Sequence, residues 1–398
     1  MRHKFPLSWP IISFKEVAEV VTGTTPLTSH PEYYGGSIPF IGPAELGKVE
    51  SITQSPKSLS PDGAKQARLL PAETVLVCCI GATIGKVGFS GTQLATNQQI
   101  NALVCNKDIV FPRYVFHYCR TLESLIRHQG ASTTLPLLPK GRFQEIEIPI
   151  PPLEEQKRIA EILDRAEELR AKRREAIAQL NTLTQSIFFE MFGNSVNNFN
   201  IATIEEVAAK SQYALSSGPF GSNLTSQHYV DDGVIILRGL NVTGNRLNLE
   251  SLKFISQEKA KELARSEVKP GDIVVVAVGS SGLAYQIPSS LPRAIMSQNF
   301  NKITPDLQKV NATYLTFCIN TSIVQNQINQ KITDTVRTFL SLTKLKTIKI
   351  PLPPLSLQQE FARRIQSVEK LKASHRASLS ELDALFASLQ HRAFRGEL

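Results

Sequence analysis

The sequence predicts an α+β fold in which two similar mixed domains are separated by two long antiparallel helices, arranged as a pseudo-twofold internal repeat. Two observations predict this fold. The segment IPIPPLEEQKRI at 148–159 returns as IPLPPLSLQQEF at 350–361, an offset of 202 residues. Each copy opens a stretch without proline or glycine, at 153–192 and at 355–394. The chain therefore runs from a domain through a proline step into a helix, and then repeats that order.

The repeat extends beyond the proline steps in both directions. Upstream, TNQQIN at 96–101 resembles MSQNFN at 296–301, and LPAETVLV at 70–77 resembles KPGDIVVV at 269–276. Two copies are too few for a solenoid, so we expect a duplicated domain-and-helix architecture. Downstream, identical residues pair at the offset of 202: Gln156 with Gln358, Glu167 with Glu369, Leu169 with Leu371, Arg174 with Arg376, and Phe192 with Phe394. We expect four segments, with boundaries at 1–147, 148–192, 193–349 and 350–398.

Both proline-free stretches are predicted to be helices with a coiled-coil seam. Proline can open a helix but not continue one, and about 40 residues make a helix of roughly 60 Å. Positions that alternate by three and four, most of them apolar, predict the seam. In the first stretch these positions are Ile159, Ile162, Ala166, Leu169, Arg173, Ala176, Leu180, Leu183 and Ile187. In the second they are Phe361, Arg364, Val368, Leu371, His375, Ser378, Leu382, Leu385 and Leu389.

Chain connectivity fixes the direction of the pairing. The first helix leads out of the first domain and the second leads back, so helices that pair along their seams are antiparallel. The domains would then lie at opposite ends, related by an approximate twofold axis. The alternative is that each helix packs only on its own domain.

The segments outside the helices read as mixed structure. TVLVCCIGA and DIVVVAVGS are β-branched runs that end in glycine, which is typical of a strand followed by a tight turn. RYVFHYCRTLESLIRHQ and NATYLTFCINTSIVQNQINQ have helical apolar spacing. These patterns predict an α+β domain with several strands, polar loops and a few helices.

Composition excludes several classes of protein. With 42% hydrophobic and 20% charged residues, the chain fits a soluble globular protein, and no apolar run reaches the roughly 18 residues of a membrane span. The start MRHKFPLSWP lacks the apolar core of a signal peptide. The five cysteines form no C-x-x-C pair, so neither a disulfide framework nor a zinc site is predicted. We expect a cytoplasmic protein with no membrane partner.

The net charge of +9 lies mostly on the predicted domains. Residues 1–152 carry +3 and residues 193–354 carry +5, while the two predicted helices together add only +1. A basic bias on the domains favours a polyanionic partner.

No catalytic motif stands out. GATIGKVG at 81–88 resembles a phosphate-binding loop, but it has three residues between its glycines instead of four, and Val87 follows Lys86 where Ser or Thr is needed. The seven histidines show no ligand spacing with Cys or Asp, and no methyltransferase or nuclease motif is convincing. An enzyme with an unrecognised site remains an open alternative, but no catalytic residue and no metal ligand is nominated.

Loops rich in hydrogen-bonding side chains are the candidate binding surface. Asn, Gln, Ser, Thr and Arg are the side chains that read base edges, and backbone amides of Gly/Ser loops suit phosphates. Any surface loop has a similar composition, and Gln98 and Gln298 can equally be structural. The candidate DNA-binding residues are Thr24, Thr25, Tyr33, Lys86, Asn97 and Gln98 in the first domain, and Ser217, Asn223, Arg238, Asn241, Ser281 and Gln298 in the second.

The chain resembles the specificity subunit of Type I restriction–modification systems over its whole length. The resemblance rests on the opening FPLSWPIISFKEVAEVVTGTTPLTSHPEYYGGSIPFIG and on the junctions IPIPPLEEQKRIAEILD and IPLPPLSLQQEFARRI. It implies two target-recognition domains that each read half of a split site in double-stranded DNA. It also implies two helices, called conserved regions, that hold these domains apart and dock two methyltransferase subunits. The second junction has Ser356 and Leu357 where the first has Glu154 and Glu155, so the two docking sites need not be equally strong.

The resemblance further implies that the subunit has no catalytic activity of its own. S-adenosylmethionine, ATP and Mg²⁺ are then expected on the partner subunits only, with DNA cleavage assigned to a separate restriction/translocase subunit. Because the halves differ in sequence, we expect an asymmetric bipartite target whose spacer is set by the helices. A coiled-coil scaffold that does not bind DNA is the alternative.

Overall fold

The computed structural model describes residues 9–130, 136–193, 199–243, 246–249, 251–279, 282–333 and 339–398. The chain divides into two compact units. Unit 1 comprises residues 1–177 and 375–398, and unit 2 comprises residues 178–374. Each unit thus contains one mixed domain and part of each long helix. The four-segment division remains a prediction, and its boundaries at 147/148 and 349/350 fall inside the strands β10 and β22.

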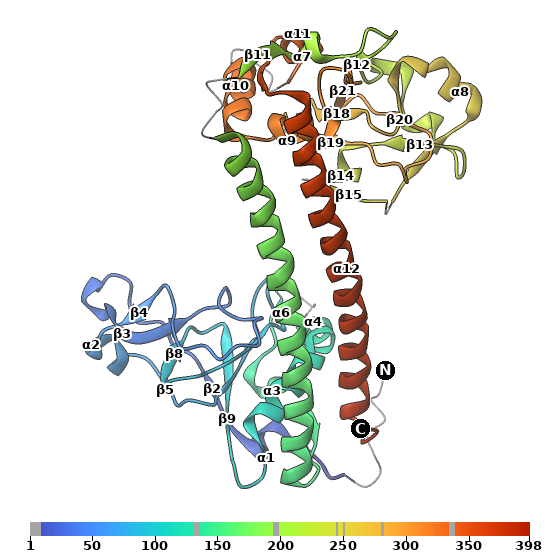
Figure 1. Ribbon diagram of the computed structural model, residues 1–398. Coiled ribbons are helices and arrows are strands. Elements are labelled where there is room, and N and C mark those ends of the chain that lie inside the picture. Colours follow the sequence, from blue (N-terminus) through green and yellow to red (C-terminus); the bar gives the residue numbers. More distant parts are fainter. Residues whose placement is uncertain are drawn as a thin grey trace. The chain divides into compact units, whose positions relative to one another are not determined.

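Unit 1 contains two four-stranded sheets and a two-stranded one (Figure 1). The first sheet has the order β2 (Ala18–Thr22), β9 (Ile100–Cys105), β6 (Val75–Cys78) and β7 (Val87–Phe89), all antiparallel. The second has the order β4 (Ser58–Leu59), β3 (Tyr34–Ile41), β8 (Leu94–Thr96) and β5 (Leu69–Leu70), with β3 and β8 parallel. The small sheet pairs β1 (Ile11–Ser13) with β10 (Glu147–Pro149).

Unit 2 repeats the same three sheets in the same order. They are β12 (Leu215–Ser217), β21 (Phe300–Ile303), β18 (Ile273–Val276) and β19 (Ala284–Gln286), then β16 (Lys253–Ile255), β13 (Val234–Leu237), β20 (Ala294–Met296) and β17 (Glu267–Val268), and finally β11 (Asn200–Thr203) with β22 (Lys349–Leu352). Within the part of the chain that the structure describes, only unit 2 has the further hairpin of β14 (Val242–Thr243) and β15 (Arg246–Leu247).

The helices repeat as well. Unit 1 has α1 (Phe14–Val17), α2 (Pro61–Lys65), α3 (Pro112–Thr121), α4 (Glu123–Gly130), α5 (Lys140–Phe143) and the first part of α6 (Leu153–Phe192). Unit 2 has α7 (Ile204–Val207), α8 (Gln257–Glu262), α9 (Ala312–Ile319), α10 (Ser322–Thr333), α11 (Leu342–Lys346) and the first part of α12 (Leu355–Ala393). The predicted α+β repeat is therefore confirmed element by element.

The proline step is held in each unit by a buried glutamine. The amide of Gln156 accepts from the backbone N–H of Phe111 (2.8 Å) and donates to the carbonyls of Ile109 (3.1 Å) and Pro151 (2.8 Å). Such bonds matter because proline leaves this backbone without N–H donors, and a buried polar group needs a partner. The side chain has no exposed surface.

Gln358 makes the same three bonds in unit 2. It accepts from Asn311 (2.9 Å) and donates to Lys309 (3.3 Å) and Pro353 (2.8 Å). A buried tyrosine hydroxyl completes each junction, because Tyr114 donates to Pro149 and Tyr314 donates to Pro351. The repeated sequence segments 148–159 and 350–361 therefore form the same joint in each unit, between the last strand of the domain and its long helix.

The two long helices pair antiparallel within each unit. In unit 1, Arg158 of α6 donates to the carbonyl of Leu398, and Arg173 bonds the ring nitrogen of His375 at 2.6 Å. In unit 2, Lys372 of α12 donates to Thr184 of α6 at 2.8 Å. Residue numbers rise along one helix as they fall along its partner, which confirms the predicted direction.

The predicted seam is correct in part. Ile159, Phe361 and Val368 are buried, and Ile162, Leu180 and Leu382 are partly buried. The seam assignment is wrong for four leucines that are about half exposed: Leu169, Leu183, Leu371 and Leu385. In each unit both helices also pack on the domain. The buried stripe therefore runs through 163, 177 and 184 on α6, with the partly buried 170 between them, and through 365, 372 and 386 on α12. A seven-residue spacing is kept, but it is centred one residue away from the leucines.

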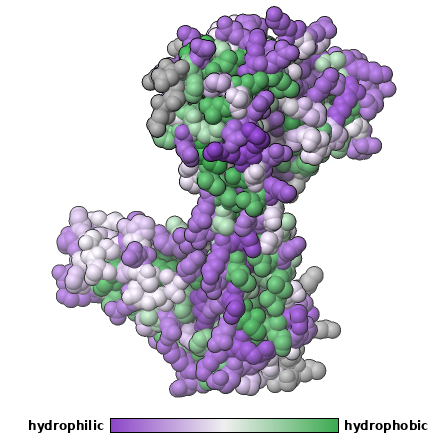
Figure 2. Space-filling model, in the orientation of Figure 1, coloured by the Kyte–Doolittle hydropathy of each residue, from purple (hydrophilic) through white to green (hydrophobic). Residues whose placement is uncertain are grey.

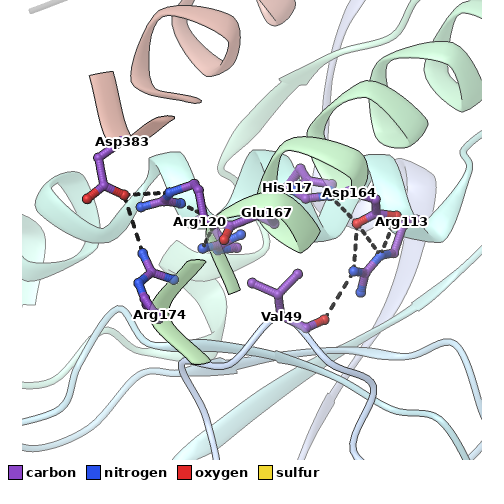
Figure 3. A network of polar contacts seen from close by, with 9 residues as sticks. Val49, Arg113, His117, Arg120, Asp164, Glu167, Arg174 and Asp383 are labelled. Atoms are coloured by element: carbon purple, nitrogen blue, oxygen red, sulfur yellow. Dashed lines mark hydrogen bonds and ion pairs between the residues drawn. The ribbon is translucent and has the colours of Figure 1, made fainter. Parts of the chain in front are cut away.

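A polar network joins α6 to the domain in unit 1 (Figure 3). Asp164 accepts two bonds from Arg113 (Nε 2.9 Å and Nη2 2.6 Å) and one from the buried His117 (Nε2, 2.8 Å). Burial opposes ionisation of Asp164, but the bonds from His117 and Arg113 outweigh burial and lower the pKa of its carboxyl group to about 2.

The imidazole of His117 is held in its neutral form. Burial lowers the pKa of His117 and outweighs its bond to Asp164. With Nε2–H donating to the carboxylate, Nδ1 is a buried atom without a hydrogen-bond partner. Protonating Nδ1 would bury an unpaired N–H donor, so the geometry and the direction of the pKa agree.

None of the described helices is both long and apolar enough to cross a membrane.

Candidate nucleic-acid interface

One edge of each domain brings together the ends of several strands. In unit 1, β3 and β8 are parallel, so both end at this edge, and the backbone N–H of Asn97 continues the pairing by donating to Ile41 (3.0 Å). The turn 97–99 then leads into β9, and β2 ends beside it at Thr22. We call the residues 23–25, 42–45 and 97–99, together with Arg68 beside them, the loop edge of unit 1.

A glycine allows the loop edge to close. A Cβ on Gly23 would lie 2.2 Å from the carbonyl oxygen of Asn97, so only glycine fits between the end of β2 and this turn. Beyond it, the hydroxyl of Thr25 donates to the amide oxygen of Gln98, and the backbone of Thr24 donates to Thr96 (2.9 Å). The structure thus brings together four predicted residues of the first domain: Thr24, Thr25, Asn97 and Gln98.

Unit 2 builds the same edge. Ser297 donates to Leu237 (2.9 Å) as Asn97 does to Ile41, and a Cβ on Gly218 would lie 1.9 Å from the carbonyl oxygen of Ser297. Gln298 is exposed at the place that Gln98 has in unit 1. The loop edge of unit 2 comprises residues 218–220, 238–241 and 297–299.

The turn after the parallel strand is capped in the same way in both units. The backbone N–H of Gly42 donates to the carboxylate of Glu45 (2.9 Å), and that of Arg238 donates to the side-chain oxygen of Asn241 (3.0 Å). Arg238 therefore occupies the place that Gly42 has in unit 1. Asn241 is buried and also donates to the carbonyl of Asn248 (3.1 Å), so its amide holds the turn instead of facing solvent.

Other polar side chains hold the edge from within. Ser217 is buried and donates to Asn301 (2.8 Å), as Thr22 does to Asn101 (2.7 Å) in unit 1. In both repeated motifs, TNQQIN and MSQNFN, the last asparagine is thus structural. The glutamine at the third position, Gln98 or Gln298, is exposed.

The remaining predicted residues lie on neighbouring loops. Tyr33 ends a short 3₁₀ segment (Pro31–Tyr33) and stacks on His30 with ring centroids 5.0 Å apart. Lys86 lies in the turn between β6 and β7 beside Gly47, and Asn223 is exposed at the end of a 3₁₀ segment, Gly221–Asn223. Ser281 lies outside the described residues. A role in DNA binding remains a prediction for all twelve residues.

Sequence reasoning missed one residue of the edge. The exposed Arg68 donates from Nη1 to the carbonyl of Thr22 (2.9 Å), directly before Gly23. Arg68 stands 45 residues from Gly23 in the chain, and no motif marks it. Only the packing of β5 on β8 brings it to this place.

The edge presents hydrogen-bonding groups of several kinds. Among the described residues, no group of three or more His, Cys, Asp and Glu side chains could hold a metal ion. The edge instead offers amides, hydroxyls, a guanidinium group and backbone N–H groups in two versions that differ between the units.

Comparison with known families agrees with this arrangement. The family model described as "Type I restriction modification DNA specificity domain" matches residues 6–182 and 232–384, one match in each half of the repeat. The chain belongs to this family. The predicted resemblance to Type I specificity subunits is thereby confirmed.

Relatives of the specificity-domain family match along the whole chain. The MjaIX specificity subunit of Methanocaldococcus jannaschii is 23% identical over 99% of this chain and 94% of its own length. A crystal structure of a Type I restriction–modification S subunit from M. genitalium superposes with a TM-score of 0.62 at 16% identity, covering 99% of both chains. A chain from work on complex assembly and conformational transition of the type I R-M system gives a TM-score of 0.58 at 17% identity, covering 99% and 100%. At these identities the two structures support the shared fold.

Proposed function

We propose that the chain is the DNA-reading subunit of a Type I restriction–modification complex. Each loop edge reads one half of a bipartite site in double-stranded DNA. The observation that carries this proposal is the loop edge itself, which is built twice on the same backbone bonds with different exposed side chains. A duplicated frame with diverged contacts is what an asymmetric two-part target needs.

The chemistry of the edges supports a nucleic-acid partner. Amide and guanidinium side chains at Gln98, Gln298 and Arg238 match the donors and acceptors of base edges, and each good bidentate contact discriminates by about 1–3 kcal/mol. The net charge of +9 favours phosphate contacts that weaken with salt. A coiled-coil scaffold would have no use for this charge or for exposed amides at matched places.

The long helices set the spacing between the half-sites in this proposal. The helix α6 spans 40 residues without interruption, from Leu153 to Phe192. At about 1.5 Å per residue, one added turn lengthens a helix by about 5.4 Å, which is more than the 3.4 Å rise of one base pair. The helices thus determine both the distance and the rotational phase of the target.

The four half-exposed leucines supply a docking surface for two methyltransferase subunits. Leu169 of α6 and Leu385 of α12 belong to unit 1, next to the ion pair of Arg170 with Asp383. Leu371 and Leu183 belong to unit 2, next to the bond of Lys372 with Thr184. These pairs are related by the offset of 202, so two copies of one partner find the same apolar contact. Figure 2 shows apolar residues at the surface of the helices in this view.

The reaction chemistry belongs to the partners in this proposal. Methyl transfer, with S-adenosylmethionine and base flipping, is assigned to the two methyltransferase subunits, and ATP- and Mg²⁺-dependent cleavage to the restriction subunit. The specificity chain itself contributes recognition and assembly, and the complex works in the cytoplasm.

Methylome mapping tests the reading function. DNA from cells that express the chain with its methyltransferase partner should carry methylation in an asymmetric motif of two short blocks separated by a fixed spacer. Cells with the partner alone are the control. Methylation that does not depend on the chain, or binding by the assembled complex that ignores salt concentration, would rule out the proposal in favour of a scaffold.

Helix length tests the spacing role. One turn inserted into both long helices should change the preferred spacer and leave both half-site sequences intact. Glycine–serine residues inserted directly after Gly193, beyond the end of α6, provide a matched control that lengthens the chain but not the helices. An unchanged spacer in the helix variant contradicts the spacing role.

Introducing a charge on the leucines tests the docking surface. Leu169→Glu with Leu385→Glu should remove one methyltransferase copy, and Leu371→Glu with Leu183→Glu should remove the other, as read from the mass of the complex in analytical ultracentrifugation. Thr182→Glu changes an exposed polar residue of the same helix and should leave both copies bound. Full assembly by the leucine variants would place docking elsewhere.

A further inference from the structure

Each loop edge carries one arginine whose guanidinium is fixed by a backbone carbonyl. In unit 2, Arg238 donates from Nη2 to the carbonyl of Ser251 at 2.6 Å. In unit 1, Arg68 donates from Nη1 to the carbonyl of Thr22 at 2.9 Å. A guanidinium has five N–H donors, so one bond to a carbonyl orients the plane and leaves other donors for a ligand.

The residue that accepts the bond from Arg238 has an unfavourable backbone conformation. Ser251 has φ of 56°, in the left-handed region that residues other than glycine rarely adopt. The main chain of Arg238 is fixed as well, through its bond to Asn241. Both ends of the side chain are thus held, which lowers the entropy lost when a partner binds.

The surroundings of Arg238 favour a base edge over a phosphate. Leu240 is 75% exposed two residues away, and Phe220 is 58% exposed at the neighbouring loop of the same edge. Exposed apolar side chains gain nothing from a phosphate, but they match thymine methyl groups in the major groove. A fixed guanidinium beside apolar side chains and the amide of Gln298 therefore has the composition of a base-reading surface.

The two anchored arginines stand at non-equivalent places. Gly42 of unit 1 occupies the position of Arg238. The strand pairings of Leu69 with Ala95 and of Glu267 with Ile295 are equivalent, so Arg68 corresponds to Ser266, whose hydroxyl donates to the carbonyl of Ser217 (3.3 Å). The two units thus share the backbone of the loop edge, but the anchored arginine stands at a different position in each.

We propose that Arg238 and Arg68 each read a guanine, through O6 and N7, at different positions of their respective half-sites. This inference rests on the proposed DNA-reading function and adds the base and the residue that reads it. Arginine bidentate to guanine is the pairing that its planar fork favours. Because the arginines differ in position, the guanines lie at different distances from the spacer.

The test is a selection of bound duplexes from a random library by the full chain assembled with its methyltransferase partner. With Arg238→Ala, one guanine of one half-site should lose its preference by about tenfold or more, while the other half-site keeps its full motif. With Arg68→Ala, the loss should move to the other half-site. Arg293→Ala, which removes an arginine from unit 2 away from the loop edge, should leave both motifs unchanged.

A modified base separates base reading from phosphate contact. Replacing the assigned guanine by 7-deazaguanine removes the N7 acceptor, so it should weaken binding by the unmodified chain and have no further effect on Arg238→Ala. The intact motif of the other half-site shows that each variant is folded. An Arg238→Ala variant that binds all duplexes more weakly with an unchanged motif, or binds them unaltered, overturns the inference. A chain that selects no two-part motif at all overturns the proposed function, and the inference with it.

Discussion

The layer that joins the two long helices beside each domain is built twice in this chain, with different chemistry. Unit 1 uses charged groups stacked on rings: Arg170 lies over Phe386 (4.4 Å to the centroid) and pairs with Glu167 and Asp383 at 2.6 Å each. Unit 2 uses rings packed on rings: Phe361 contacts Phe188, Phe192 and Phe317 with centroids 5.3–5.5 Å apart.

Matched positions show which residues differ between the ionic layer of unit 1 and the aromatic layer of unit 2. Phe386 of unit 1 corresponds to Thr184 of unit 2, and Arg170 corresponds to Lys372, which bonds Thr184 instead of stacking. His117 in α3 corresponds to Phe317 in α9, where no charge is present. The glutamine joint is the same in both units. The joint therefore defines the architecture, and the layer beside it tolerates a change from ionic to aromatic packing.

The largest expected effect comes from removing the central ring of unit 2. Phe361→Ala should destabilise unit 2 by about 3–5 kcal/mol, because it deletes a fully buried side chain that touches three other rings. Ile159→Ala, the matched change in unit 1, removes fewer atoms and should cost less. Urea unfolding followed by hydrogen-exchange mass spectrometry reports peptides of each unit separately. Equal losses in the two variants would show that the rings of unit 2 add nothing beyond ordinary apolar burial.

The glutamine joint should respond equally in both units. Gln156→Ala and Gln358→Ala each leave one backbone N–H and two carbonyls without their partner, and each should cost about 2–4 kcal/mol. The same hydrogen-exchange measurement checks the two values, with the exposed Gln359→Ala as a control near zero. One hydrogen bond contributes about 1 kcal/mol net. If the two variants differ by more than that amount in their loss of unfolding free energy, the two joints share a geometry but not an energy.

Much of this architecture follows from the sequence. The proline steps and the long stretches without glycine or proline predict the junctions and the helices, because they depend on local backbone chemistry. The strands 75–78 and 273–276 are predicted by their β-branched runs for the same reason. The antiparallel direction follows from chain connectivity alone.

The errors and omissions all concern tertiary packing. Leu169 and Leu371 have seam spacing, yet the domains pull the buried stripe to the neighbouring residues, and no helical pattern contains that information. Arg68 reaches the loop edge only because β5 lies beside β8. The buried roles of Ser217 and Asn241 depend on partners in strands and turns that are distant in sequence or fold back locally.

A smaller effect is expected from the ionic layer of unit 1. Arg170→Leu should destabilise unit 1 by about 1–3 kcal/mol, through the lost stacking on Phe386 and the loss of a partner for the buried Glu167. Glu167 keeps its bond from Arg120 (2.7 Å), which limits the loss. Lys372→Leu is the matched change in unit 2. The effect in unit 1 should shrink in high salt, since the Asp383 end of the network is exposed, and a salt-independent loss would show that packing alone explains it.

The smallest expected effect is a difference between the units in how their stability depends on pH. The pKa of His117 is lowered in the folded state by burial, so below about pH 6.5 the unfolded chain takes up a proton that the folded unit refuses. The stability of unit 1 should therefore fall as pH drops from 7 toward 5, by no more than about 1.4 kcal/mol per pH unit for one proton. The groups that face His117 act in opposite directions, since Asp164 favours its charge and Arg113 and Arg120 oppose it.

His117→Gln keeps a donor for Asp164 but cannot titrate, so it should flatten this slope and leave stability at pH 7 nearly unchanged. Unit 2, with Phe317 at the matched place, is the internal control. Asp164 contributes a separate loss only below about pH 4, because its carboxyl group ionises with a depressed pKa of about 2 and its stabilising effect is complete above the ordinary value. Hydrogen exchange of α3 peptides between pH 7 and 5, corrected for the intrinsic exchange rate, measures the difference. If the stability of α3 and of α9 changed equally with pH, His117 would not link protonation to folding. The two units would then respond alike to acid, although one has an ionic layer and the other an aromatic one.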